Sequence, residues 1–170
     1  MARANDACMP ESSLRLLWIS ALVIVLDQIT KQVAQAWLPL RQIVDVIPGF
    51  DWYLTYNTGA AFSFLADAGG WQRWFFTIST IVISAVIVFW IKRVPVSEKL
   101  TGVSLCLILG GAIGNLIDRI YLGYVIDYIQ VWLGSYPWPA FNIADAAISI
   151  GATVLILSSF TGSDKSTDDD

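Results

Sequence analysis

Two aspartates stand in apolar surroundings, where a charged side chain is costly, and they are the first candidates for chemistry. Asp127 lies within residues 125–128 (VIDY), and Asp145 lies within residues 141–145 (FNIAD). Two carboxylates held within a few ångströms share one proton, because both cannot ionise easily. Such a pair can activate a water molecule and protonate a leaving amine. The two aspartates are therefore candidate hydrolytic machinery, provided that the fold brings them together.

The composition excludes several other kinds of hydrolytic site. The chain contains no histidine, which removes Ser-His-Asp and Cys-His catalysis and histidine-ligated zinc. Cys8 and Cys106 lie far apart and give neither a metal-ligand spacing nor a disulfide framework. Basic residues are nowhere clustered as nucleic-acid binding requires. We therefore expect no metal, no cofactor and no nucleic-acid partner.

Several polar residues could support the two aspartates. Asn142 precedes Asp145 by three residues, and Asn115 precedes Arg119 by four, so each pair shares one face of a helix. Amides orient carboxylates through hydrogen bonds, and Arg119 could form an ion pair with one of them. Alternatively, Asn142 is a helix cap and Asn57 a turn residue.

Each charged candidate also has a plain structural interpretation. Asp145 would be favoured in the first turn of a helix by the helix dipole, and Asp127 could be a solvated loop carboxylate. Asp27 and Lys31 are four residues apart, in the order that suits an ion pair. We expect this structural ion pair to brace the end of its helix rather than to take part in chemistry.

The elements that must position these residues are predicted to be membrane-spanning helices. Apolar residues make up 56% of the 170 residues and charged residues only 14%, against about 25% charged in soluble domains. An apolar run of 18 residues spans roughly 27 Å as a helix, close to a hydrocarbon core. The predicted single membrane domain has spans at about 14–37, 71–91, 100–117 and 141–160, followed by an acidic tail at 161–170.

The first of these segments has a second interpretation. Its apolar run is followed by Ala34-Gln35-Ala36, which is typical of the cleavage site of a secretory signal peptide. The region before the run is not positive, because Asp6 and Glu11 offset its arginines. A retained span is therefore the preferred interpretation, and a cleaved segment stays open.

Four spans place both termini on one side of the membrane. The positive-inside rule assigns that side, with the loop 92–99, to the cytoplasm, so residues 38–70 and 118–138 lie outside. The first outer segment, within about 40–70, has β-branched and aromatic residues on both sides of Pro48-Gly49. This pattern predicts a small hairpin or sheet on the membrane surface, and residues 124–132 are similar.

Five blocks in a fixed order resemble the lipoprotein signal peptidase family, also called signal peptidase II. The blocks are residues 27–31 (DQITK), 57–63 (NTGAAFS), 110–119 (GGAIGNLIDR), 125–128 (VIDY) and 141–145 (FNIAD). The resemblance covers about residues 14–160. One mild departure is Tyr128, where phenylalanine is expected in many relatives.

The resemblance implies a four-helix transmembrane bundle with a small extracytoplasmic β-sheet, or cradle. It implies a monomeric aspartyl endopeptidase of the bacterial inner membrane. Its active site would lie near the outer face, next to membrane lipid. The implied substrate is a prolipoprotein, cut just before a cysteine that carries diacylglycerol. The resemblance assigns catalysis to Asp127 and Asp145, and support of substrate and dyad to Asn57, Gly59, Asn115, Arg119 and Asn142.

Three other classes stay open on the residues alone. A small transporter could use Asp145 as a proton relay, although this leaves the outer β segments unexplained. A membrane scaffold could use Gly110 and Gly114 as a helix-packing face. A presenilin-like protease would need a Gly-x-Gly-Asp signature, which does not precede Asp127.

Overall fold

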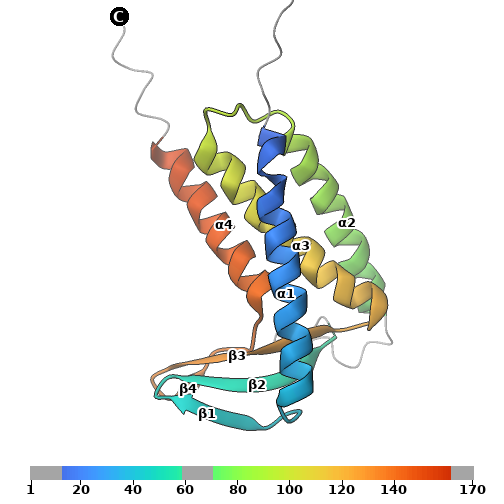
Figure 1. Cartoon of the computed structure of the whole chain (residues 1–170), viewed down its shortest axis with the longest axis vertical. Coiled ribbons are helices and arrows are strands. Elements are labelled where there is room, and N and C mark those ends of the chain that lie inside the picture. Colours follow the sequence, from blue (N-terminus) through green and yellow to red (C-terminus); the bar gives the residue numbers. More distant parts are fainter. Residues whose placement is uncertain (1–12, 59–70, 162–170) are drawn as a thin grey trace, which may run out of the picture.

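Four long helices and a small sheet make up the protein, in a computed structural model that describes residues 13–58 and 71–161 (Figure 1). Each helix includes a stretch long and apolar enough to cross a membrane, as the sequence predicts. The sheet lies at the end of the bundle opposite to the start of α1 and the end of α4. The helices are α1 (Leu17–Trp37, after a 3-10 turn at Ser13–Leu16), α2 (Trp71–Ile91), α3 (Lys99–Tyr121) and α4 (Ile143–Thr161).

Helix α3 is the central helix and packs against the other three. Glycines on its buried face allow this close approach. A Cβ atom at Gly110 would lie 2.8 Å from Val23 Cβ, and one at Gly114 would lie 2.6 Å from Asp27 Oδ2. Any larger residue would therefore push α1 away. The interpretation of these glycines as a packing face agrees with the structure.

Helix α3 is also longer than predicted. The sequence suggested an end at residue 117, with an outer loop from 118, but the helix continues to Tyr121. Gly123 follows the end of the helix by two residues, with a φ of 86°, and its N–H donates to the carbonyl of Asp118 at 3.2 Å. Asp118 does not end the helix because its carboxylate forms an ion pair inside the bundle. Asp118 and Arg119 are thus helical residues.

The sheet is antiparallel, and β2 and β3 are its central strands. A hairpin turns at Pro48-Gly49, as predicted, with Gly49 at a φ of 91°. The second outer segment joins this hairpin, because β3 pairs with β2 and sets Asp127 opposite Thr55. The strands are β1 (Ile43–Ile47), β2 (Phe50–Asn57), β3 (Val125–Leu133) and β4 (Tyr136–Pro137).

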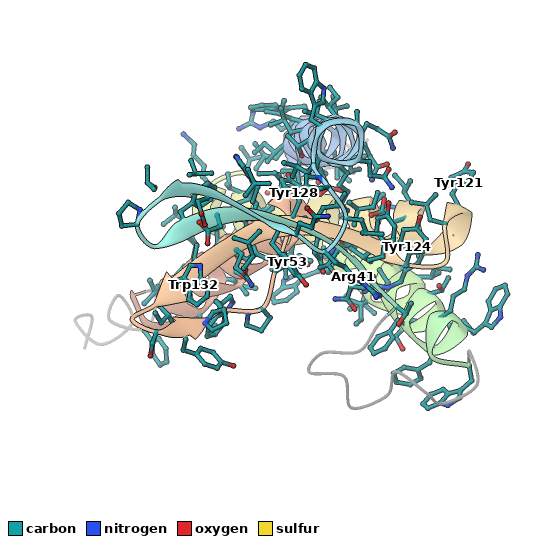
Figure 2. The ribbon with its side chains drawn as sticks, turned by 90° about the horizontal axis from the view of Figure 1, so that it is seen from below. Arg41, Tyr53, Tyr121, Tyr124, Tyr128 and Trp132 are labelled. Atoms are coloured by element: carbon teal, nitrogen blue, oxygen red, sulfur yellow. The ribbon has the colours of Figure 1, made fainter. Side chains whose placement is uncertain are left out.

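Helix α1 extends beyond the bundle and holds one face of the sheet. Ala34 of α1 forms a small core with Leu54, Ile126 and Tyr128. Figure 2 shows α1 on one side of the sheet and α2 on the other. Because side chains alternate along a strand, Asp127 points away from the face that Ile126 and Tyr128 present to α1. The sheet therefore separates α1 from the Asp127 carboxylate.

Candidate active site

The candidate residues come together where the sheet meets the helix ends. Asp127 lies on β3, Asp145 in the first turn of α4, and Asn142 just before that helix. Asn57 is the last residue of β2, and Asn115 and Arg119 lie near the end of α3. Gly59, which was expected to support the site, lies outside the described residues.

Asn142 connects the two aspartates. Its Nδ2 donates to Asp127 Oδ1 at 2.7 Å, and its backbone N–H donates to Asp145 Oδ2 at 3.2 Å. In return, the backbone N–H of Asp145 donates to Asn142 Oδ1 at 2.9 Å. This reciprocal pair is a capping box, which satisfies backbone donors at the start of α4. Asn142 is therefore both a helix cap and a partner of the two carboxylates.

Two further amides complete the hydrogen bonds of the carboxylates. Asn57 Nδ2 donates to Asp127 Oδ2 at 3.0 Å, and Asn115 Nδ2 donates to Asp145 Oδ1 at 2.8 Å. Each carboxylate oxygen of the two aspartates thus accepts an N–H from a neutral group. We call Asp127 and Asp145 the carboxylate pair.

Burial raises the pKa of Asp127 to about 7. The side chain is 2% exposed, and loss of solvent is the main cause of the shift. The negative charge of Asp145 raises this pKa further, whereas the hydrogen bonds from Asn57 and Asn142 and the charge of Lys31 lower it. A carboxyl with a pKa near 7 is protonated in about half of the molecules at neutral pH. The carboxylate pair can therefore hold one proton and exchange it.

The contacts of Arg119 differ from those predicted from the sequence. Its guanidinium forms no ion pair with the described aspartates, although the sequence suggested one. Instead it lies 5.7 Å from the ring centre of Phe76, and Nη1 reaches the Asn115 carbonyl at 3.4 Å. Its position in the last turn of α3 directs the side chain along that helix and toward α2. The charge of Arg119 thus borders the site without neutralising either carboxylate.

Arg73 is a site-bordering residue that the sequence analysis missed. It donates from Nε to the Arg119 carbonyl at 3.0 Å and from Nη2 to the Ile120 carbonyl at 2.7 Å. These bonds satisfy free carbonyl groups at the end of α3. Arg73 therefore joins the first turn of α2 to the end of α3. An arginine at the start of a predicted span was the available signal.

Asp27 and Lys31 form the predicted ion pair, with 2.8 Å between Lys31 Nζ and Asp27 Oδ2. The pair does not brace a helix end: both side chains are fully buried between α1, α3 and α4. Lys31 also contacts Asp118 Oδ2 at 2.8 Å, and Asp27 Oδ1 accepts the N–H of Ala144 at 3.0 Å. We call Asp27, Lys31 and Asp118 the ionic cluster.

Asp118 is a member of this cluster that the sequence did not indicate. The sequence placed it beside Arg119 near the end of the third span but gave it no role, although its spacing of three from Asn115 puts both on one helix face. Its two oxygens also accept from Gln28 Nε2 at 3.0 Å and from the backbone N–H of Ile126 at 3.2 Å. The ionic cluster thus connects α1 and α3 to the strand that carries Asp127. Within residues 13–58 and 71–161, no group of three or more histidine, cysteine or acidic residues could hold a metal ion.

The chemistry open to this site is acid–base catalysis by two carboxyl groups. They are held by neutral donors, at the end of a membrane bundle, and they can carry one proton between them. This arrangement suits activation of water beside a polarised carbonyl group.

Comparisons with known proteins show which family this chain is similar to. The family model described as Signal peptidase (SPase) II matches residues 19–161. A lipoprotein signal peptidase of Alteromonas mediterranea is 50% identical over 159 residues, which cover 94% of this chain and 87% of the relative. One from Ectopseudomonas mendocina is 54% identical over 164 residues, covering 93% and 96% of the two chains.

A solved structure also matches the fold. It is described as a bacterial membrane enzyme, is 27% identical to this chain, and superimposes with a TM-score of 0.82. The match covers 95% of this chain and 98% of the other. Sequence and fold agree, and the chain belongs to the signal peptidase II family, whose members are peptidases.

Proposed function

We propose that this protein is a lipoprotein signal peptidase that acts as an aspartyl endopeptidase. It removes the signal peptide of a prolipoprotein on the N-terminal side of a diacylglyceryl-modified cysteine. The observation that carries the proposal is the carboxylate pair, joined by Asn142 and held by neutral donors, in a chain without histidine. The relatives that are about half identical to this chain share the name lipoprotein signal peptidase.

The proposed reaction uses the carboxylate pair as base and acid. The ionised carboxylate takes a proton from a water molecule, whose oxygen attacks the scissile carbonyl carbon. The protonated carboxyl donates to the carbonyl oxygen, which gives a neutral tetrahedral intermediate. Collapse of this intermediate breaks the C–N bond: the protonated carboxyl delivers its proton to the cysteine nitrogen, and the ionised carboxylate takes up a proton from one hydroxyl group of the intermediate, which leaves as the new carboxylic acid. The amides keep both carboxylates in place during these transfers, and no metal enters the reaction.

The proposed orientation puts the site where such a substrate would meet water. The signal peptide and the lipid chains of the cysteine are apolar and reside in the bilayer. Lys92 and Arg93 lie in the loop between α2 and α3, and Lys99 is the first residue of α3, so the positive-inside rule assigns this end to the cytoplasm. The sheet and the carboxylate pair lie at the other end of the bundle (Figure 1), hence near the outer face of the bacterial inner membrane.

The test is an assay on a diacylglyceryl-modified prolipoprotein with purified protein in detergent. The variants Asp127→Asn and Asp145→Asn each remove one member of the carboxylate pair. Asp51→Asn is the matched control: Asp51 is 7% exposed, lies on the neighbouring strand, and accepts from Trp132 Nε1 at 2.6 Å. We expect cleavage before the lipidated cysteine by the wild type and Asp51→Asn, and none by the other two.

The other outcomes of this assay would contradict the proposed residues or the proposed reaction. Cleavage that survives in Asp127→Asn or Asp145→Asn would assign the same reaction to other residues. A well-folded wild type that cleaves nothing would favour a proton relay, which changes ion flux without cleavage, or a packing scaffold.

A further inference from the structure

Lys31 makes more contacts than an ion pair needs. Its ammonium is fully buried and has three N–H donors. It meets three acceptors: Asp27 Oδ2 at 2.8 Å, Asp118 Oδ2 at 2.8 Å and Asn115 Oδ1 at 2.9 Å. The first two contacts balance charge within the ionic cluster. The third contact is with the neutral amide of Asn115, so attraction between opposite charges does not explain it.

The contact with Lys31 decides which way the Asn115 amide points. An asparagine side chain has an oxygen end that accepts and a nitrogen end that donates, and the two ends have nearly the same shape. Lys31 can only donate, so Asn115 must present Oδ1 to it. The Nδ2 end then faces Asp145 Oδ1, at 2.8 Å.

The reversed amide would make two repulsive contacts. Its NH₂ group would face the ammonium of Lys31, and its carbonyl oxygen would face the carboxylate of Asp145. Asn142 Nδ2, which donates to Asn115 Oδ1 at 3.2 Å, disfavours the reversed amide as well. Lys31 therefore fixes the orientation of the Asn115 amide, and that orientation allows Asn115 to donate to Asp145. The two residues thus connect the ionic cluster to the carboxylate pair.

We propose that Lys31 is a positioning residue of the peptidase reaction, which acts by holding Asn115 in the orientation that donates to Asp145. The inference rests on the proposed function. It predicts that Lys31 contributes to turnover through Asn115 and not through its ion pairs. The loss should fall on kcat rather than KM, because neither side chain is asked to bind substrate.

A double-mutant cycle tests this route. Lys31→Met removes the donor and keeps the length of the side chain up to Cε. Asn115→Ala removes the amide that Lys31 is proposed to orient. In the Asn115 background, Lys31→Met should lower kcat by about 10- to 100-fold, as is typical when an outer partner of a site residue is lost. In the Asn115→Ala background, the same change should cost less than about twofold.

Asp27→Asn is the matched control, because it breaks an ion pair with Lys31 and leaves the contact between Lys31 and Asn115. It should lower kcat less than Lys31→Met does. Unfolding temperature is measured for every variant, so a loss of folded protein is separated from a loss of turnover. If Lys31→Met does not fold, the pair Asp27→Asn/Lys31→Met removes one buried charge of each sign and takes its place in the cycle.

The outcomes are distinct. Equal losses from Lys31→Met in both backgrounds would overturn the inference, as would a kcat loss in Asp27→Asn equal to that in Lys31→Met. An unchanged kcat in folded Lys31→Met would overturn it too. A wild type that cleaves no lipidated substrate overturns the proposed function and the inference together, whereas an active wild type with an additive cycle overturns the inference alone.

Discussion

The ionic cluster and the carboxylate pair place the same type of side chain in two electrostatic settings. Asp27 and Asp118 of the ionic cluster share the ammonium of Lys31, at 2.8 Å each. Asp127 and Asp145 receive hydrogen bonds from amides and from a backbone N–H, with no cation in ion-pair contact among the described residues. Both sets are satisfied by hydrogen bonds. They differ in whether a cationic side chain contacts the carboxylates directly.

This difference suits the two sets to different tasks. In the ionic cluster the ammonium of Lys31 contacts both carboxylates, and losing it leaves uncompensated charge inside the protein. A buried carboxylate held only by neutral donors keeps its place, while the burial that raises the pKa of Asp127 lets it take up a proton. The first arrangement stabilises a fold, and the second allows proton transfer.

The carboxylate pair should be needed for turnover and dispensable for folding. In Asp127→Asn and Asp145→Asn, cleavage should fall by roughly 10⁴-fold or more, the order found for a catalytic aspartate in other proteases. Both variants should still insert and show a cooperative unfolding transition in detergent, followed by circular dichroism. If both variants failed to fold while Asp27→Asn folded normally, the roles of the two sets would be reversed.

The ionic cluster should be needed for stability as well as for the orientation of Asn115. Removing Lys31 leaves Asp27 and Asp118 without a counter-ion, so Lys31→Met should lower the free energy of unfolding by roughly 3–5 kcal/mol. The combined variant Asp27→Asn/Lys31→Met should recover part of this loss, because one of the two buried negative charges is gone. Unfolding of the purified proteins in detergent would measure both. A combined variant no more stable than Lys31→Met alone would mean that the cluster does not act through charge.

The contacts that distinguish the ionic cluster from the carboxylate pair could be predicted from sequence only in part. The four helices followed from local hydropathy, and the hairpin from the turn at Pro48-Gly49. The pair Asp27–Lys31 followed from a spacing within one helix. In contrast, Asp118 contacts Lys31 from a distant part of the chain, so no spacing within one helix relates the two residues. Contacts between distant segments depend on packing, which the glycines of α3 permit but do not specify.

The contacts within the candidate active site could likewise be predicted only in part. For Asn142, the helix cap and the contact with Asp145 could both be predicted, because they join residues three apart. The contact with Asp127 joins residues fifteen apart and depends on the packing of β3 against the start of α4. The ion pair expected of Arg119 is not formed with the described aspartates, since its side chain lies along its own helix and over Phe76. The position of Arg73 at the start of a span marked it as unusual but did not indicate its partners at the distant end of α3.

The raised pKa of Asp127 predicts how stability depends on pH. The folded protein holds a proton up to about pH 7, whereas the unfolded chain releases it near 3.8. Native protein therefore binds more protons between these values, and the contribution of Asp127 to stability is full below about pH 4 and is lost as the pH rises through 7. The unfolding temperature of wild type should thus fall between pH 5 and pH 8 by more than that of Asp127→Asn. Equal pH dependence in the two proteins would show that Asp127 titrates normally.

The smallest effect is expected at Tyr128, which follows Asp127 in sequence but lies on the opposite face of the sheet. Tyr128 packs with Ala34 of α1 and with Leu54 (Figure 2), so its ring stabilises the sheet from the face opposite to the Asp127 side chain. Tyr128→Phe keeps the ring, and we expect kcat within about twofold of wild type and a stability change of about 1 kcal/mol or less. Tyr128→Ala removes the ring and should cost about 3–5 kcal/mol. A large kcat loss in a stable Tyr128→Phe would show that the two faces of β3 are coupled, and that the carboxylate pair depends on more than its amides.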